Sequence, residues 1–182
     1  MVDTINELHT NQGVLIESVK LEDGHLTADT VTTTVLNYEP PHAKMTFESE
    51  SEALTMSTNV WTKFTNATDD LFSGISVTNI TQAGDSLTII VPGDYLVNAS
   101  VSFSGTTNTD LYEFAIFVND IKASIAIPRS TTSTDIGNVS LPFYLEGLQA
   151  GDDICLKIRN TANNFDATLI ACSWITTLLH TE

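Results

Sequence analysis

Histidine is the side chain that most often carries acid–base or metal chemistry at neutral pH. The chain has four, at His9, His25, His42 and His180, so three lie in its N-terminal part and one lies near its C-terminus. None of them has the short spacing to another histidine or to a cysteine that a zinc site needs. The histidines therefore predict no metal centre.

The two cysteines, Cys155 and Cys172, each lie within an apolar run with the pattern of a strand. Burial in such a run raises the pKa of a thiol and leaves it unreactive. We interpret both as buried free thiols. A disulfide between them remains open as an alternative.

Paired carboxylates occur at Glu22-Asp23, Asp69-Asp70 and Asp152-Asp153. Solvated turns explain these pairs, because aspartate is favoured in turns. The other interpretation is Ca²⁺ held at loop tips or on an assembly axis, although the spacing is not that of an EF-hand. We assign no metal and no cofactor. The sequence also lacks a Gly-x-Ser-x-Gly elbow and a phosphate-binding glycine loop, and we predict that the protein is not an enzyme.

The charge balance is strongly acidic, with 23 Asp and Glu against 7 Lys and Arg and a formal net charge of -16. Nucleic acids and anionic membrane surfaces are poor partners for such a chain. The first ten residues, MVDTINELHT, have neither the basic nor the apolar region of a signal peptide. No apolar run is long enough to span a membrane. We expect a soluble protein made in the cytoplasm.

Residues 86–105 are the most regular stretch of the chain. Two apolar runs flank the turn Pro92-Gly93-Asp94, in which Pro fixes one backbone angle and Gly permits an unusual one. From Tyr95 to Phe103, apolar residues alternate with mostly polar ones. This period of two is typical of a strand with one face on a core.

The same pattern repeats along the chain, with turn signals roughly every 8–12 residues, the spacing of a sandwich. It predicts an all-β protein built from two antiparallel sheets. Besides the pair within 86–105, the expected strands are 47–56, 61–64, 75–80, 111–118, 121–127, 139–145, 154–158 and 167–179.

Two of these strands, 111–118 and 167–179, are apolar on both faces. One face of a sandwich strand covers the core, and the other is normally in water. No helix is expected that would cover the second face, but another copy of the chain would do so. Shielding by the chain's own loops is the alternative. The residues that we expect at the interface between copies are Leu111, Phe114, Ile170, Cys172, Trp174 and Leu178.

The order of these motifs resembles the jelly roll of the C1q and tumour-necrosis-factor family over about residues 60–179. SLTIIVPGDYLVNASVSF resembles the family's strand, Pro-Gly turn, Tyr and alternating strand, and FAIFVND resembles its next strand and Asn turn. VSLPFYLEGLQAGDDICLKI resembles its leucine-rich strand and Gly-Asp turn, and ATLIACSWITTLL resembles its closing strand. The resemblance implies a jelly roll that trimerises through the sheet holding the closing strand. The absence of a collagen repeat departs from secreted animal members.

Residues 1–44 carry only short, sparse apolar pieces that cannot bury a core alone. The phrase GVLIESVKLEDGHLTADT resembles the N-terminal attachment and shaft segments of bacteriophage fibre and other virion structural proteins. This resemblance implies an arm that is ordered by assembly, and a disordered leader is the alternative. The expected anchor residues are Val14, Ile16, Val19 and Leu21. We place the extended arm and its stiff Glu39-Pro40-Pro41 linker in 1–44 and the jelly roll in 45–182.

The sequence therefore predicts a structural protein of a bacteriophage virion surface. We expect a homotrimer that acts as a capsid decoration or head-fibre protein and binds a major capsid or tail protein through residues 1–44. The alternative is a receptor- or glycan-binding tail-fibre tip, because three loops are rich in Thr, Asn and Ser. These loops are 105–110, 129–135 and 160–166, and the candidate glycan-stacking aromatics are Trp61, Tyr112 and Tyr144. A third possibility is a trimeric sandwich hydrolase with carboxylates between subunits.

Overall fold

The computed structural model describes residues 39–48, 52–65, 71–106, 110–131 and 135–181. These residues belong to one compact unit, Glu39–Glu182. The described part consists of strands and their connections, and none of it is a helix with the length and apolar character needed to cross a membrane. The expected anchor residues Val14, Ile16, Val19 and Leu21 lie outside the described residues.

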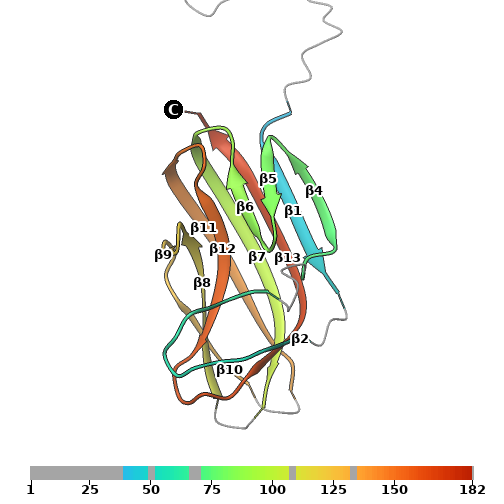
Figure 1. Ribbon diagram of the computed structural model, residues 1–182, viewed down its shortest axis with the longest axis vertical. Helices are drawn as coiled ribbons and strands as arrows, with labels where there is room; N and C mark the ends of the chain where they lie inside the picture. Colours follow the sequence, from blue (N-terminus) through green and yellow to red (C-terminus); the bar gives the residue numbers. More distant parts are fainter. Residues whose placement is uncertain (1–38, 49–51, 66–70, 107–109, 132–134, 182) are drawn as a thin grey trace, which may run out of the picture. The chain divides into compact units, whose positions relative to one another are not determined.

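The strands form two antiparallel sheets that face each other, the jelly-roll sandwich that the sequence predicts (Figure 1). The six-stranded sheet has the order β11 (Gly137–Leu148), β7 (Gly93–Gly105), β13 (Ala167–His180), β1 (His42–Phe47) and β4 (Gly74–Thr78), with β2 (Glu52–Leu54) beside β13. The seven-stranded sheet has the order β10 (Ile127–Thr131), β8 (Asp110–Val118), β12 (Asp153–Asn160), β6 (Ser86–Ile89) and β5 (Ile80–Ala83). In it, β3 (Thr62–Lys63) lies beside β12 and β9 (Ile121–Lys122) beside β8.

The core between the sheets is rich in aromatic side chains. Trp174 of β13 is fully buried and meets Phe72 edge-to-face, with ring centroids 5.9 Å apart. Across the sandwich, Phe103 of β7 packs on Phe114 of β8 with centroids 4.6 Å apart. The alternating residues from Tyr95 to Phe103 are each fully buried, as their period of two predicts.

A β-bulge in β13 decides which of its side chains face the core. Leu169 pairs with Phe103, but Ala171 pairs with Ser102, so Ile170 is an extra residue in the ladder. Before the bulge the odd-numbered residues point inward, and after it the even-numbered ones do. The strand therefore has one core-facing side along its whole length.

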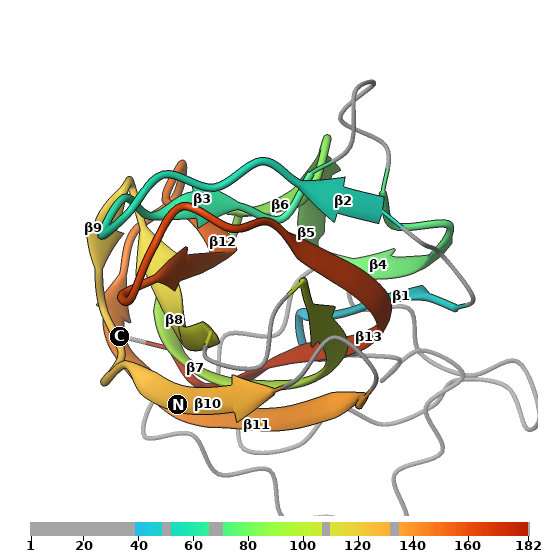
Figure 2. The ribbon, with the colours of Figure 1, turned by 90° about the horizontal axis from the view of Figure 1, so that it is seen from below.

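The sandwich has two ends, which we name by the parts of the chain that lie there. At one end β7, β10 and β12 all finish, and we call this the loop end; Figure 2 views the molecule from this side. At the opposite end, the terminal end, the carbonyl of Pro41 accepts a hydrogen bond of 2.8 Å from the Leu178 amide. The chain thus enters the sandwich beside the end of β13, at the far side from the loop end.

The start of the jelly roll differs from the expected residue 45. β1 begins at His42 and pairs with β13 from His42↔Thr177 to Phe47↔Cys172. Alternate residues of β1, such as Ala43 and Met45, are buried against the core. The segment from His42 to Lys44, which we expected in the linker, is therefore part of the domain.

Candidate functional surfaces

The outer face of the six-stranded sheet exposes both apolar and polar side chains. Residues directly opposite in a sheet share a face, and the register links Pro142 with Asn98, Asn98 with Ile175 and Ile175 with Lys44. All four are exposed. We call this the Ile175 row, and we call the face the outer sheet face.

Large apolar side chains gather on the half of the outer sheet face nearer the terminal end. Leu96, Tyr144, Ile175 and Leu179 are 42–56% exposed in the single subunit. On the other half, Ser100, Ser102, Ser173 and Thr46 border a polar groove of about 290 Å³ with Lys44 at its side. Only part of this face therefore resembles a surface that a protein partner would cover.

The structure corrects most of the interface that the sequence predicts. Phe114 and Trp174 are fully buried, and Cys172 and Leu178 are 4% and 7% exposed, all within the core of one subunit. The bulge at Ile170 turns these residues of β13 inward and leaves Ile175 and Leu179 outward. Of the expected set, only Leu111, at 39% exposure, and the half-buried Ile170 reach the surface.

The outer face of β8 is covered by the chain itself. Phe117 and Ala115 of β8 and Cys155 of β12 form a second, small apolar cluster, and Trp61 packs on it. The Trp61 and Phe117 rings meet edge-to-face with centroids 5.2 Å apart. Shielding by the chain's own loop, the alternative to a second copy, is thus correct for this strand.

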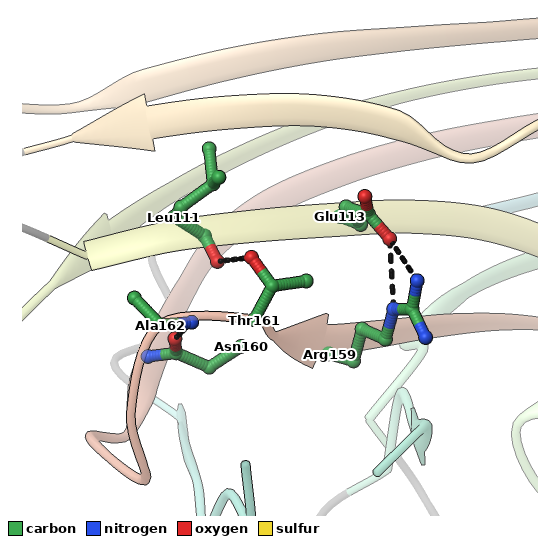
Figure 3. Close-up of polar contacts among 6 residues, drawn as sticks. All are labelled: Leu111, Glu113, Arg159, Asn160, Thr161 and Ala162. Atoms are coloured by element: carbon green, nitrogen blue, oxygen red, sulfur yellow. Dashed lines mark hydrogen bonds and ion pairs between the residues drawn. The ribbon is translucent and has the colours of Figure 1, made fainter. Parts of the chain in front are cut away.

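Two cations complete that cover. Arg159 lies over the Trp61 ring at 4.7 Å. It also forms an ion pair with Glu113, with Nε to carboxylate at 2.7 Å, which Figure 3 shows. Lys157 lies over the Phe117 ring at 4.7 Å and pairs with Asp120 at 2.6 Å. Their alkyl stems cover apolar area while the charged heads stay at the surface. Around Phe117 this face is therefore covered by the chain itself, whereas Leu111 near the start of β8 stays 39% exposed.

The open edge between β10 and β11 contains an apolar pocket of about 140 Å³. Ile116 of β8 lines it together with Ile125 and Ile127 from the β10 side and Leu141 and Phe143 from β11. The two strands lie side by side at this edge in Figure 2. Ile125 is 71% exposed at the pocket in a single subunit.

The loop end is held by a buried polar network. Asp110 is fully buried, and its carboxylate accepts hydrogen bonds from the Tyr112 hydroxyl at 3.1 Å and the Asn163 amide at 2.9 Å. Asn160, also fully buried, accepts from the amides of Ala162 and Asn163 and donates to Asn163. Figure 3 shows Thr161 anchored to the Leu111 carbonyl beside it. The network rigidifies the 160–166 loop.

The three aromatic residues expected as a glycan platform lie apart. Tyr112 is fully buried, and burial together with Asp110 raises its pKa. Trp61 packs on the seven-stranded sheet, whereas Tyr144 is 47% exposed on the outer sheet face. At the loop end the exposed ring is that of Phe165, at 44%.

The exposed Tyr144 is tied to the start of β7. Its hydroxyl donates to Asp94 at 2.5 Å, and the other Asp94 oxygen accepts from the Gly147 amide at 2.9 Å. The hydrogen bond to Asp94 raises the pKa of Tyr144 to about 12. The bonds from Tyr144 and Gly147 lower the pKa of Asp94.

Both thiols are free and buried, as interpreted from the sequence. Burial raises the pKa of Cys155 to about 11 and that of Cys172 to about 12. Thiols with these pKa values are poor nucleophiles at neutral pH. Within the described residues, no three His, Cys, Asp or Glu side chains gather where they could hold a metal ion.

Comparison with known proteins identifies the fold. No protein-family model and no curated protein matches the sequence. Among solved structures, the globular domain of zebrafish complement 1qA matches at a TM-score of 0.54 and 13% identity over 79% of this chain and 100% of that one.

The PRD1 vertex protein P5 matches at 0.52 and 14% identity over 78% and 98% of the two chains. Murine APRIL matches at 0.51 and 15% over 75% and 99%. These likenesses confirm that the chain has the C1q/TNF-like jelly-roll fold.

Proposed function

We propose that this protein is a non-enzymatic structural component of a virion surface, made in the host cytoplasm and incorporated as a homotrimer. It decorates a capsid or forms a head fibre. The observation that carries this proposal is the outer sheet face, where Leu96, Ile175 and Leu179 remain exposed in one subunit. A neighbouring copy that covers them would remove this apolar area from water. The shared fold with a phage vertex protein supports the virion as the setting.

The distribution of charge favours contact between copies on the outer sheet face. The chain carries a net charge of -16, so two copies repel unless their contact avoids carboxylates. The Ile175 row has no carboxylate and contains Lys44. The next row toward the loop end, two residues along each strand, joins Ser140, Ser100, Ser173 and Thr46 and has no carboxylate either. Contact between copies through these two rows brings no carboxylates together, since Asp94, which binds Tyr144, and Glu48, which borders the polar groove, lie outside them.

The two ends of the sandwich support a division of roles. The chain enters at the terminal end, and the loop end lies opposite. In the proposed particle, the part of the predicted arm 1–44 that precedes β1 binds a major capsid or tail protein, with Val14, Ile16, Val19 and Leu21 as the apolar anchor. The loop end is then directed away from the particle.

The decisive experiment uses antibodies against the protein on purified particles of its source phage. Immunogold labelling of the particle surface, together with recovery of the protein in the particle fraction, is the expected result. Light scattering on the full-length protein should give three times the mass of one chain. Recovery only in the particle-free fraction would remove the virion assignment, and a monomer at micromolar concentration would remove the trimer.

A second candidate function is the receptor- or glycan-binding tip of a tail fibre. The convergence of three polar loops at the loop end favours it, because the buried Asp110 and Asn160 hold one of them rigid and Phe165 is exposed there. Binding of the full-length protein to host cells, lost in the Phe165→Ala variant, would support the tip. A decoration protein shows no such binding.

A further inference from the structure

The pocket between β10 and β11 has the character of a socket for one apolar side chain. Its floor is Ile116, and Ile127, Leu141 and Phe143 form its walls. The hydroxyl of Ser124 in the lining is already occupied, since it accepts from the Ile116 amide at 2.9 Å and donates to the Ile125 carbonyl at 3.0 Å. The pocket therefore presents no polar group that calls for a polar ligand.

The size of the pocket limits its occupant. Its volume is about 140 Å³, and an apolar cavity of about 150 Å³ takes one benzene-sized group. One branched aliphatic side chain matches this volume. The exposed Ile125 at the pocket would be covered together with it.

The sheet register shows which outward side chain lies at the same position along the strand direction as the pocket. Pro142 lines the pocket and belongs to the Ile175 row, since it pairs with Asn98, which pairs with Ile175. A threefold rotation about an axis along the strands moves residues sideways but keeps their height along the axis. In the proposed trimer, with its axis along the strands, such a rotation would bring the outward Ile175 of one copy level with the pocket of the next.

The contact joins two different surfaces, an edge and a face. Contacts of this heterologous kind close into a ring when the rotation is that of a small cyclic group. Each copy then gives one Ile175 and receives one, so neither the pocket nor the side chain is left unsatisfied. The arrangement also uses the one row of the face that holds Lys44 and no carboxylate.

We infer that the pocket at the β10–β11 edge receives Ile175 from a neighbouring copy of the chain, and that the pocket is complete only in the assembly. This inference rests on the proposed homotrimer and adds the residue and the socket to it. It commits to a second copy as the occupant.

The test is a disulfide cross-link between full-length chains carrying both Ile125→Cys and Ile175→Cys. Because one chain then holds both halves of the contact, oxidation should close the ring and give a covalent trimer on a non-reducing gel, which reduction returns to single chains. Chains with one new cysteine can form covalent dimers at most. The native Cys155 and Cys172 are 2% and 4% exposed and should not contribute.

The matched control carries Ile136→Cys and Ile175→Cys. Ile136 is 58% exposed, but it lies just before β11 and six residues before Pro142, about 20 Å away along the strand direction. This pair should give no covalent trimer. A trimer by light scattering without a cross-link in the first pair, or with one in the control pair, would overturn the socket and leave the proposed function intact. A monomer by light scattering would overturn both the socket and the proposed homotrimer.

Discussion

At the scale of single residues, two glycines with positive φ differ in what surrounds them. Gly93 has φ +149° and is packed so closely that an added Cβ would collide with the His180 carbonyl oxygen and the Leu178 side chain. Gly151 has φ +95° but faces open space. The first position of β7 therefore needs glycine for both conformation and close approach.

We expect Gly93→Ala to lower the free energy of unfolding by about 3 kcal/mol, because it combines a strained backbone with a clash. Gly151→Ala should lower it by only about 1 kcal/mol, the cost of the backbone conformation. Urea denaturation of both variants and the parent checks this. Equal losses would show that the collision at Gly93 is relieved without cost.

The Tyr144–Asp94 hydrogen bond predicts a dependence on alkaline pH. The folded-state pKa of Tyr144 is raised to about 12 from its ordinary value of 10.0. The stability that this bond contributes is therefore fully present below pH 10 and is lost as the pH rises toward 12. We expect Tyr144→Phe to be less stable than the parent at pH 8, and the difference to shrink by pH 12. Urea midpoints measured across this range test it, and a constant difference would contradict it.

At the scale of elements, the short segment around β3 does the work that we expected of a second subunit. Trp61 covers Phe117 and Cys155 on the outer face of the seven-stranded sheet, and Arg159 covers Trp61 in turn. The apolar outer face of β8 was visible in the sequence. The cover by Trp61 could not be predicted from the sequence, because the contact between Trp61 and Phe117 spans more than fifty residues of chain and leaves no local periodicity.

We expect Trp61→Ala to destabilise the protein by about 2 kcal/mol, since the indole is half-buried. It should also uncover Cys155, whose reaction with a thiol reagent should become about tenfold faster under native conditions. Cys172, on the opposite sheet, serves as the internal control in mass-spectrometric peptide mapping. An equal acceleration at both cysteines would point to global unfolding and contradict the local cover.

The closing strand shows how one residue alters the assignment of faces. A strict period of two, counted from Ile170 as a surface residue, assigns Cys172, Trp174 and Leu178 to the outside. The bulge adds one residue, and every following side chain changes face. The fully buried Trp174 is the result, and Ile175 becomes an outward residue, whereas a strict period of two predicts it on the opposite face.

At the scale of the whole molecule, the outer sheet face predicts how the proposed trimer can be separated into folded subunits. Leu96 is 42% exposed, so an aspartate there is tolerated in one subunit but is unfavourable in a contact between copies. We expect Leu96→Asp to give folded monomers by light scattering and circular dichroism. The control is Val60→Asp, 53% exposed and in the segment before β3, which should remain trimeric. Dissociation by both variants, or by neither, would argue against this face.

By itself, the sequence determined the all-β class, the approximate position of β7, β8, β11, β12 and β13, and the resemblance to the C1q/TNF jelly roll. The expected strands 47–56 and 121–127 are wrong as single strands, because the structure has the shorter β1, β2, β9 and β10 in and around them. These follow from alternation and turn chemistry, which are local properties of the chain. Only the tertiary structure decided which side of β13 faces water, which strand face Trp61 covers, and that a pocket opens between β10 and β11. Each of these depends on a bulge or on contacts between segments far apart in the chain, and the free energy of such contacts is not encoded in any single stretch.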